Sequence, residues 1–320
     1  MLTTNKPFKI EKETFGNYDS VTILNVEHGI ELQIINGFGA IINKYIVNHS
    51  PFSFIQGYSN PQELTDQNPY FSRSAKLFPF PNRLANGEYQ FDDQHYQLPA
   101  NFPWSEHAVH GLLYNQPFDV INSSADNNQA SVTLRYKTDA LHPQFPHAFV
   151  LDITYQIDLS GQLRCSTSIE NLGSQSFPYG DAWHPYFTLN VPREQCLLTM
   201  PNCVELEHIN DLPSGNKYPF NRFSTPSSLA NVSLNHCFEF DLQSPIELSL
   251  QSKDGNTALH YQQDTSYPFI QLYTPDNESS LAIEPMTCPA NAFNNRIGLL
   301  TLHPHQRSQF QWQCQAVYKA

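Results

Sequence analysis

The sequence predicts an all-β protein, a large antiparallel β-sandwich formed by one continuous domain over residues 1–320. In many short segments every second side chain is apolar, the pattern of strands with one buried and one wet face. The 24 prolines interrupt the chain and leave little room for long helices. No convincing helix-length amphipathic stretch is present. Many short strands without helices between them favour a sandwich or barrel over a parallel sheet.

The clearest strand pair lies in the middle of the chain. Apolar residues alternate along 149–159 and again along 163–169, with Ser160 and Gly161 between the two runs. Because serine and glycine suit a tight turn, these runs predict an antiparallel hairpin. The same alternation predicts further strands at 89–91 and 96–98 around the turn Asp92-Asp93, and at 132–136, 246–250 and 310–318.

The charge of the chain narrows the classes of partner. It carries a net charge of -13, with 17 Lys and Arg against 30 Asp and Glu. An acidic surface repels nucleic acid phosphates and anionic lipids, so neither is an expected partner. A phosphorylated substrate is disfavoured too, although a local basic pocket would still hold one. No apolar stretch is long enough to span a membrane.

The N-terminal residues and the cysteines predict the compartment. Residues 1–15 carry no apolar core of the signal-peptide type, so we expect a cytoplasmic protein. The six cysteines are scattered, with no Cys-x-x-Cys pair, and are most simply reduced thiols. A structural zinc site would need tighter clustering. No P-loop or dinucleotide fingerprint is present, so no cofactor is expected.

Two segments with polar residues at expected strand ends come early in the chain. Arg83 follows the proline-bracketed run 78–82 and offers five donors to a ligand, or is simply a surface arginine in a turn. His107 and His110 lie three apart; on one helical face they would suit a metal, whereas in a strand or loop they diverge. No third ligand lies nearby, which favours packed or surface histidines and no metal.

Two later segments offer an acid and a base. His184 lies among Trp183, Pro185, Tyr186 and Phe187, where aromatic faces suit sugar rings and a histidine can titrate near neutral pH. The alternative is a core histidine satisfied by a backbone carbonyl. Glu284 follows three apolar residues and precedes a proline, at the end of a buried strand, where burial would raise its pKa and suit it to base work. The alternative is a salt-bridged strand-end glutamate.

Taken together and in this order, these segments resemble the aldose 1-epimerase (galactose mutarotase) family. The most specific parts are His184-Pro185-Tyr186-Phe187 and Glu284-Pro-Met-Thr; the softer parts are Gly37-Phe-Gly-Ala40, Asn82-Arg83, Gly87-x-Tyr89-x-Phe91, Tyr96-x-Leu98, His110-Gly111 and Asn291-Ala-Phe-Asn294. The resemblance covers nearly the whole chain. It implies a galactose mutarotase-like supersandwich with its site in a cleft on one concave sheet.

The resemblance also implies residue roles. His184 would be the general acid and Glu284 the general base, and Arg83 and His110 would match sugar-binding positions. Family members usually hold sugar hydroxyls with an aspartate before a His-x-Phe stretch. The best match here is Asn235-His236-Cys237-Phe238, so Asn235 would bind sugar without a charge. That difference bears on substrate preference and rate.

The expected function is therefore interconversion of the anomers of a free hexose such as galactose or glucose. Ring opening needs one base and one acid, and neither a metal nor a nucleotide. A sugar-binding protein without turnover is the first alternative; it would show sugar-dependent fluorescence, expected from Trp183. A glycosidase would need two carboxylates, and only Glu284 has such a setting. A hexose-6-phosphate epimerase would need a cluster of basic residues near these segments. The sequence leaves the oligomeric state open.

Overall fold

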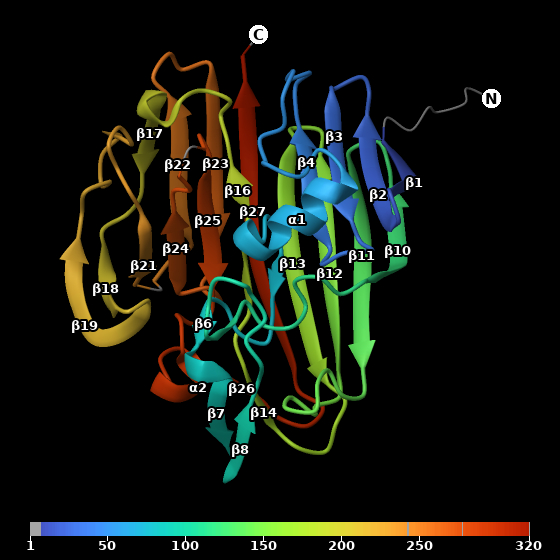
Figure 1. Ribbon diagram of the computed structural model, residues 1–320. Coiled ribbons are helices and arrows are strands. Elements are labelled where there is room, and N and C mark those ends of the chain that lie inside the picture. The colour runs from blue at the N-terminus through green and yellow to red at the C-terminus, as the bar shows by residue number, and fades with distance from the viewer. Residues whose placement is uncertain (1–7, 242, 277, 320) are drawn as a thin grey trace.

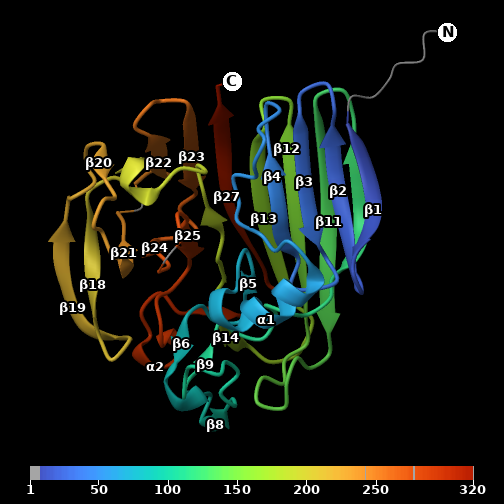
Figure 2. The same ribbon diagram turned by 45° about the horizontal axis from the view of Figure 1, so that its top comes forward.

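The computed structural model describes residues 8–241, 243–276 and 278–319 and confirms an all-β architecture (Figure 1). Residues 1–7, on which part of the signal-peptide expectation depends, and residue 320 lie outside the described residues. A long nine-stranded sheet runs across the molecule, and two smaller sheets cover its two halves (Figures 1 and 2). Within the described ranges, the helices are too short or too polar to cross a bilayer.

The nine-stranded sheet contains the hairpin predicted from the sequence. Strands β12 and β13 pair antiparallel, and buried and half-buried residues alternate along both. The chain turns between them at Gly161, whose N–H donates to the carbonyl of Asp158 at 2.9 Å. In spatial order the sheet consists of β10 (Asp119–Ala125), β11 (Gln129–Thr138), β12 (Phe149–Asp158), β13 (Gln162–Asn171), β27 (Arg307–Tyr318), β23 (Thr257–Gln263), β22 (Ile246–Ser252), β17 (Cys196–Thr199) and β20 (Ser227–Ser228).

A four-stranded meander covers the half of this sheet formed by β10 to β13 (Figure 2). Two buried tyrosines join the layers. Tyr45 donates its hydroxyl to the carbonyl of Gly161 at 2.5 Å, and Tyr155 donates to the carbonyl of Ala40 at 2.5 Å. Each buried hydroxyl thus has a partner in the opposite layer, as buried polar groups require. The meander consists of β1 (Lys9–Phe15), β2 (Tyr18–Asn25), β3 (Ile30–Ile35) and β4 (Ile41–Ile46).

An eight-stranded sheet covers the other half and carries the segments singled out in the sequence. Its Trp183 packs against Trp312 of the long sheet with ring centroids 6.2 Å apart, and against Tyr155 at 5.8 Å. These large rings fill the space between the sheets. The sheet consists of β19 (Leu212–Phe220), β18 (Cys203–Ile209), β21 (Asn235–Glu239), β24 (Phe269–Tyr273), β25 (Leu281–Met286), β15 (Ala182–Trp183) and β5 (Lys76–Leu77), with β16 (Tyr186–Phe187) also paired to β25.

The structure contains one helix of 11 residues that no amphipathic pattern indicated, α1 (Pro61–Phe71). Asn60 caps its N-terminus by accepting from the N–H of Glu63, Pro61 begins it, and the Glu63 carboxylate accepts from the N–H of Ser59 at 2.7 Å. These are ordinary start signals that the sequence displays. The helix buries only Leu64 and Asn68, so its apolar stripe is too narrow to register as periodic.

The remaining elements are short. The predicted hairpin around Asp92-Asp93 is confirmed as β7 and β8, with Glu88 opposite Gln97. These two strands and α2 lie together at the lower end of the molecule in Figure 1. The short elements are β6 (Arg83–Leu84), η1 (Ala85–Gly87), β7 (Glu88–Phe91), β8 (Gln94–Gln97), β9 (Ala108–Val109), β14 (Phe177–Tyr179), η2 (Arg193–Gln195), α2 (Ala292–Asn295) and β26 (Leu300–Leu302).

Candidate active site

His184 and Glu284 meet on the eight-stranded sheet. Nε2 of His184 lies 3.3 Å from Oε1 of Glu284. Glu284 lies in β25, two residues before the strand ends, and His184 directly follows β15, which pairs with the same strand. The backbone of His184 is fixed on both sides: its N–H donates to Ala75 at 3.1 Å, and its carbonyl accepts from Ser74 at 2.8 Å. The pairing of β15 with β25 therefore brings together two residues that are one hundred positions apart.

A buried ion pair anchors the segment before His184. Lys76 Nζ lies 2.5 Å from Oδ2 of Asp181, and both side chains are fully buried. The same oxygen accepts from the Tyr267 hydroxyl at 2.6 Å, and Lys76 also donates to Thr167 at 3.0 Å. The ammonium lies 4.5 Å from the centroid of the Trp183 ring. The charges are thus compensated inside the core, and the chain leading into His184 is held in place.

Burial pushes both members of the acid–base pair toward their neutral forms. It lowers the pKa of His184 to about 3, well below the near-neutral titration expected from the sequence. It raises the pKa of Glu284 well above its ordinary value, as expected, and the positive charge of Arg83 opposes this rise. When the pair holds a single proton and no ligand is bound, that proton therefore resides mainly on the Glu284 carboxyl group and His184 is neutral. Among the described residues, Oε2 of Glu284 is buried and has no hydrogen-bond partner, so one acceptor remains for a ligand.

His110 lies beside this pair. Its ring centroid is 5.1 Å from that of His184, edge to face, and burial strongly lowers its pKa. Nδ1 of His110 accepts from the N–H of Asn82 at 3.3 Å, so a neutral ring carries its proton on Nε2. The loop is tight: His110 and Gly111 both have positive φ, and a Cβ on Gly111 would lie 2.2 Å from the carbonyl oxygen of Phe78. Glycine is required there.

Arg83 forms one wall of a cleft of about 260 Å³. One guanidinium nitrogen donates to Asn82 Oδ1 at 3.0 Å, and another lies 3.1 Å from Oδ2 of Asp211. The guanidinium carbon is 5.2 Å from the centroid of the Trp104 ring. The cleft is lined by Tyr70, Asn82, Arg83, Trp104, His110, Asn235 and Tyr273.

Asn235 begins β21, two strands from Glu284. Its Oδ1 accepts from Gln271 Nε2 at 2.8 Å, and Gln271 is directly opposite Glu284 in the pairing of β24 with β25. The five residues selected from the sequence therefore gather at one site: Arg83, His110 and Asn235 line the cleft, and His184 and Glu284 are buried beside His110 and Gln271.

His107 does not join this group. Its Nδ1 accepts from the N–H of Asn86 at 3.1 Å, away from the bond that His110 makes to Asn82. Within the described ranges, no three His, Cys, Asp or Glu side chains are grouped as metal ligands.

Sequence reasoning gave no role to several residues of the site. Tyr70 on α1 and Tyr273 on β24 line the cleft, but no local pattern marks either one. Tyr186 was quoted in the His184 segment without a role; its ring stacks on His184 at 4.9 Å. Asp211 contacts Arg83 from a hairpin turn more than one hundred residues away, so only the folded chain shows this pair.

Comparison with known proteins shows the family of the chain. A family model described as aldose 1-epimerase matches residues 20–315. The chain belongs to the aldose 1-epimerase family. The chain is also similar to the uncharacterized protein YihR of Escherichia coli K12, with 32% identity over 255 residues that cover 72% of this chain and 75% of YihR. A family of epimerases is in general one of isomerase-type enzymes.

Solved structures show the same fold for this aldose 1-epimerase family member. A galactose mutarotase-like protein from Clostridium acetobutylicum has a TM-score of 0.86 and 18% identity, covering 98% of this chain and 100% of its own. The galactose 1-epimerase of Lactobacillus acidophilus has a TM-score of 0.80 and 18% identity, covering 99% of this chain and 100% of its own. The expected galactose mutarotase-like sandwich is confirmed.

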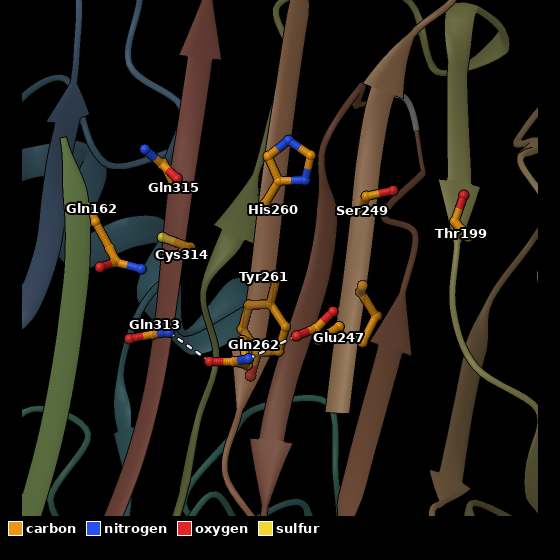
Figure 3. Close-up of a pocket in the computed structure, with 11 residues that line it drawn as sticks. Gln162, Thr199, Glu247, Ser249, His260, Tyr261, Gln262, Gln313, Cys314 and Gln315 are labelled. Carbon is orange, nitrogen blue, oxygen red and sulfur yellow. Dashed lines mark hydrogen bonds between the residues drawn. The ribbon is translucent and has the colours of Figure 1, made fainter. Parts of the chain in front are cut away.

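This protein also has a hollow of about 450 Å³ on the outer face of the nine-stranded sheet (Figure 3). Its polar side chains come from neighbouring strands and bind one another: Gln313 donates to Gln262, which donates to Glu247 at 2.9 Å. The Tyr261 and Cys314 side chains are buried in the core beneath it. This hollow lies over β13, β27, β23 and β22, on the long sheet rather than on the sheet that carries His184 and Glu284.

Proposed function

We propose that this protein is an aldose 1-epimerase that interconverts the α and β anomers of a free aldohexose such as galactose or glucose. The carrying observation is the buried pair of His184 Nε2 and Glu284 Oε1 at 3.3 Å, beside a polar cleft. The cleft, about 260 Å³, is below the roughly 300–1,000 Å³ typical of pockets for drug-sized ligands, so its size suits a single sugar ring.

The pair supplies both proton transfers of ring opening. Glu284, as carboxylate, takes the proton of the anomeric hydroxyl while His184, as imidazolium, gives a proton to the ring oxygen and the C1–O5 bond breaks. The pair then holds a carboxylic acid and a neutral imidazole. After rotation about C1–C2, the two transfers reverse and the ring closes on the other carbonyl face. Each positioned acid or base typically contributes roughly 10²–10⁴-fold.

Burial favours the protonation state that accompanies the open sugar. The neutral imidazole and carboxylic acid are the forms that desolvation stabilises. Arg83 works in the other direction, because its charge lowers the pKa of Glu284. The closed sugar thus accompanies the pair with its proton on His184, and the open sugar accompanies the pair with its proton on Glu284.

The cleft residues hold the sugar. Arg83 offers guanidinium donors, neutral His110 offers its Nε2 proton, and Asn235 offers its amide hydrogens while Oδ1 is engaged by Gln271. Trp104 supplies an aromatic face beside Arg83. Trp183, expected from the sequence to report sugar binding by fluorescence, is 1% exposed between the sheets. Trp104 is 41% exposed and lines the cleft, so it is the better reporter.

A phosphorylated hexose fits this site less well. Of the described residues that line the cleft, Arg83 is the one with a permanent positive charge, and Asp211 already pairs with it. A free sugar is the better match for this balance of charge. The net charge of -13 likewise speaks against nucleic acid and anionic membranes as partners.

The cytoplasm is the proposed compartment. All six cysteines are free and buried, which suits a reducing environment. The chain is proposed to act as one domain over residues 1–320, supported by a core cluster that contains residues of both large sheets.

Polarimetry tests the function. Freshly dissolved α-D-galactose and α-D-glucose are followed with the protein, without it, and with His184→Asn as the matched control. Faster relaxation with the wild-type protein alone is the expected result. A sugar-binding protein without turnover would instead change its fluorescence with sugar and leave the relaxation at the spontaneous rate.

A further inference from the structure

The hairpin of β18 and β19 brings a carboxylate to Arg83, a residue that lines the cleft. Ile209 pairs with Leu212, so Asn210 and Asp211 form a two-residue turn, and both have positive φ. This is the turn geometry that matches the natural twist of a hairpin. It directs Asp211 to Arg83, with Oδ2 of the carboxylate 3.1 Å from the guanidinium nitrogen. The hairpin forms the outer edge of the eight-stranded sheet (Figures 1 and 2).

A second hollow, of about 550 Å³, adjoins the cleft. Asp211 lines it together with Glu205, His208, Tyr218, Asn235 and His236. Asn235 lines both the second hollow and the cleft, so its side chain separates the two. Asp211 therefore lies in the wall where the chain has an asparagine in place of the aspartate suggested by the family resemblance.

The wall formed by Asn235 and Arg83 is richer in hydrogen-bond donors than in acceptors. Asn235 Oδ1 already accepts from Gln271, which uses one of its two lone pairs and leaves a single neutral acceptor beside the amide donors. Arg83 offers only donors. Sugar hydroxyls also need acceptors for their own protons, and a carboxylate accepts strongly at both oxygens. The Asp211 side chain is 56% exposed, whereas that of Arg83, which lines the cleft, is 16% exposed. The carboxylate is therefore open to solvent beside a cleft residue.

We propose that Asp211 is a sugar-binding residue of this chain: its carboxylate accepts hydroxyl protons of the hexose next to Asn235 and holds the Arg83 guanidinium at the cleft. The proposal deepens the proposed function and rests on it. Asp211 supplies from the β18–β19 turn the charged acceptor that Asn235 lacks. It takes no part in proton transfer, because the contact it makes is with Arg83 rather than with His184 or Glu284.

The test compares Asp211→Asn with the double variant Asp211→Asn/Asn235→Asp. Losing the acceptor should raise KM for galactose about five- to tenfold and change kcat less than about twofold, since uniform binding is lost. Restoring a carboxylate at residue 235 should return KM to within about twofold of the wild-type value. Asp93→Asn is the matched control: Asp93 is also the second residue of a two-residue hairpin turn with positive φ, and its KM should equal that of the wild type.

The outcomes separate the two proposals. Relaxation of α-galactose at the spontaneous rate with the wild-type protein would end the proposed function. In that case the dissociation constant for galactose, measured by Trp104 fluorescence, still tests Asp211: it should rise in Asp211→Asn and return toward the wild-type value in the double variant. An Asp211→Asn protein whose KM and dissociation constant stay within twofold of the wild-type values would overturn the role of Asp211. So would a double variant that remains as weak as Asp211→Asn. Circular dichroism of each variant establishes that it is folded.

Discussion

Nε2 of His184 and Oε1 of Glu284 are 3.3 Å apart, and their side chains are 7% and 3% exposed. Two titratable groups are thus held together away from water. Their separation allows one proton to be shared or exchanged through a ligand that touches both. At this separation the charge of one group acts on the other, so we expect them to titrate as a pair.

Replacing either member should nearly abolish catalysed mutarotation. His184→Asn and Glu284→Gln keep size and hydrogen-bonding capacity but cannot pass a proton at the working pH, so each should lower kcat by about 10²–10⁴-fold. The double variant should be little worse than either single one, because groups acting as a unit are not additive. Polarimetry at saturating galactose measures this. A folded His184→Asn protein with near wild-type relaxation would end the mechanism.

The pH dependence of kcat/KM should reflect the buried pair. The state with one proton is lost on the acid side when His184 also protonates, near its pKa of about 3, and on the alkaline side when Glu284 loses its proton, at a pKa raised well above the ordinary value. The profile should therefore be broad. Limbs at the ordinary values, about 4.3 for a glutamate and about 6.5 for a histidine, would instead show that burial does not control the pair. The residual activity of His184→Asn should lack the acid limb, because the group that protonates there has been removed.

Lys76→Met should unfold more easily than the wild type. It leaves the Asp181 carboxylate buried without its cation, and removing one partner of a buried ion pair typically costs about 3–5 kcal/mol. Urea unfolding followed by tryptophan fluorescence measures the loss. The matched variant Lys76→Met/Asp181→Leu removes both charges and should recover part of the stability. Equal losses in the single and double variants would argue against an uncompensated charge as the cause.

Asn235→Asp should leave the fold intact and lower KM for galactose or raise kcat. The new carboxylate still accepts from Gln271 and adds an acceptor for a sugar hydroxyl beside Arg83. Steady-state kinetics of both forms checks this, with circular dichroism as the control for folding. If neither constant changes, Asn235 does not contact the sugar.

Much of the strand pattern could be predicted because its cause is local. A strand with one buried face must alternate apolar and polar residues, and β12 and β13 show this alternation in both sequence and burial. The helix α1 was missed because it buries only two side chains. Its capping residues, Asn60 and Glu63, were visible in the sequence and were the better signal.

The all-β class, the central hairpin and the choice of His184 and Glu284 as candidate residues followed from the sequence, because residue type and spacing carry that information. The tertiary structure alone decided the distance between His184 and Glu284, the direction of their pKa shifts and the contact of Arg83 with Asp211. The physical reason is that strand pairing across long stretches of chain sets these distances, and burial depends on every layer that covers a residue.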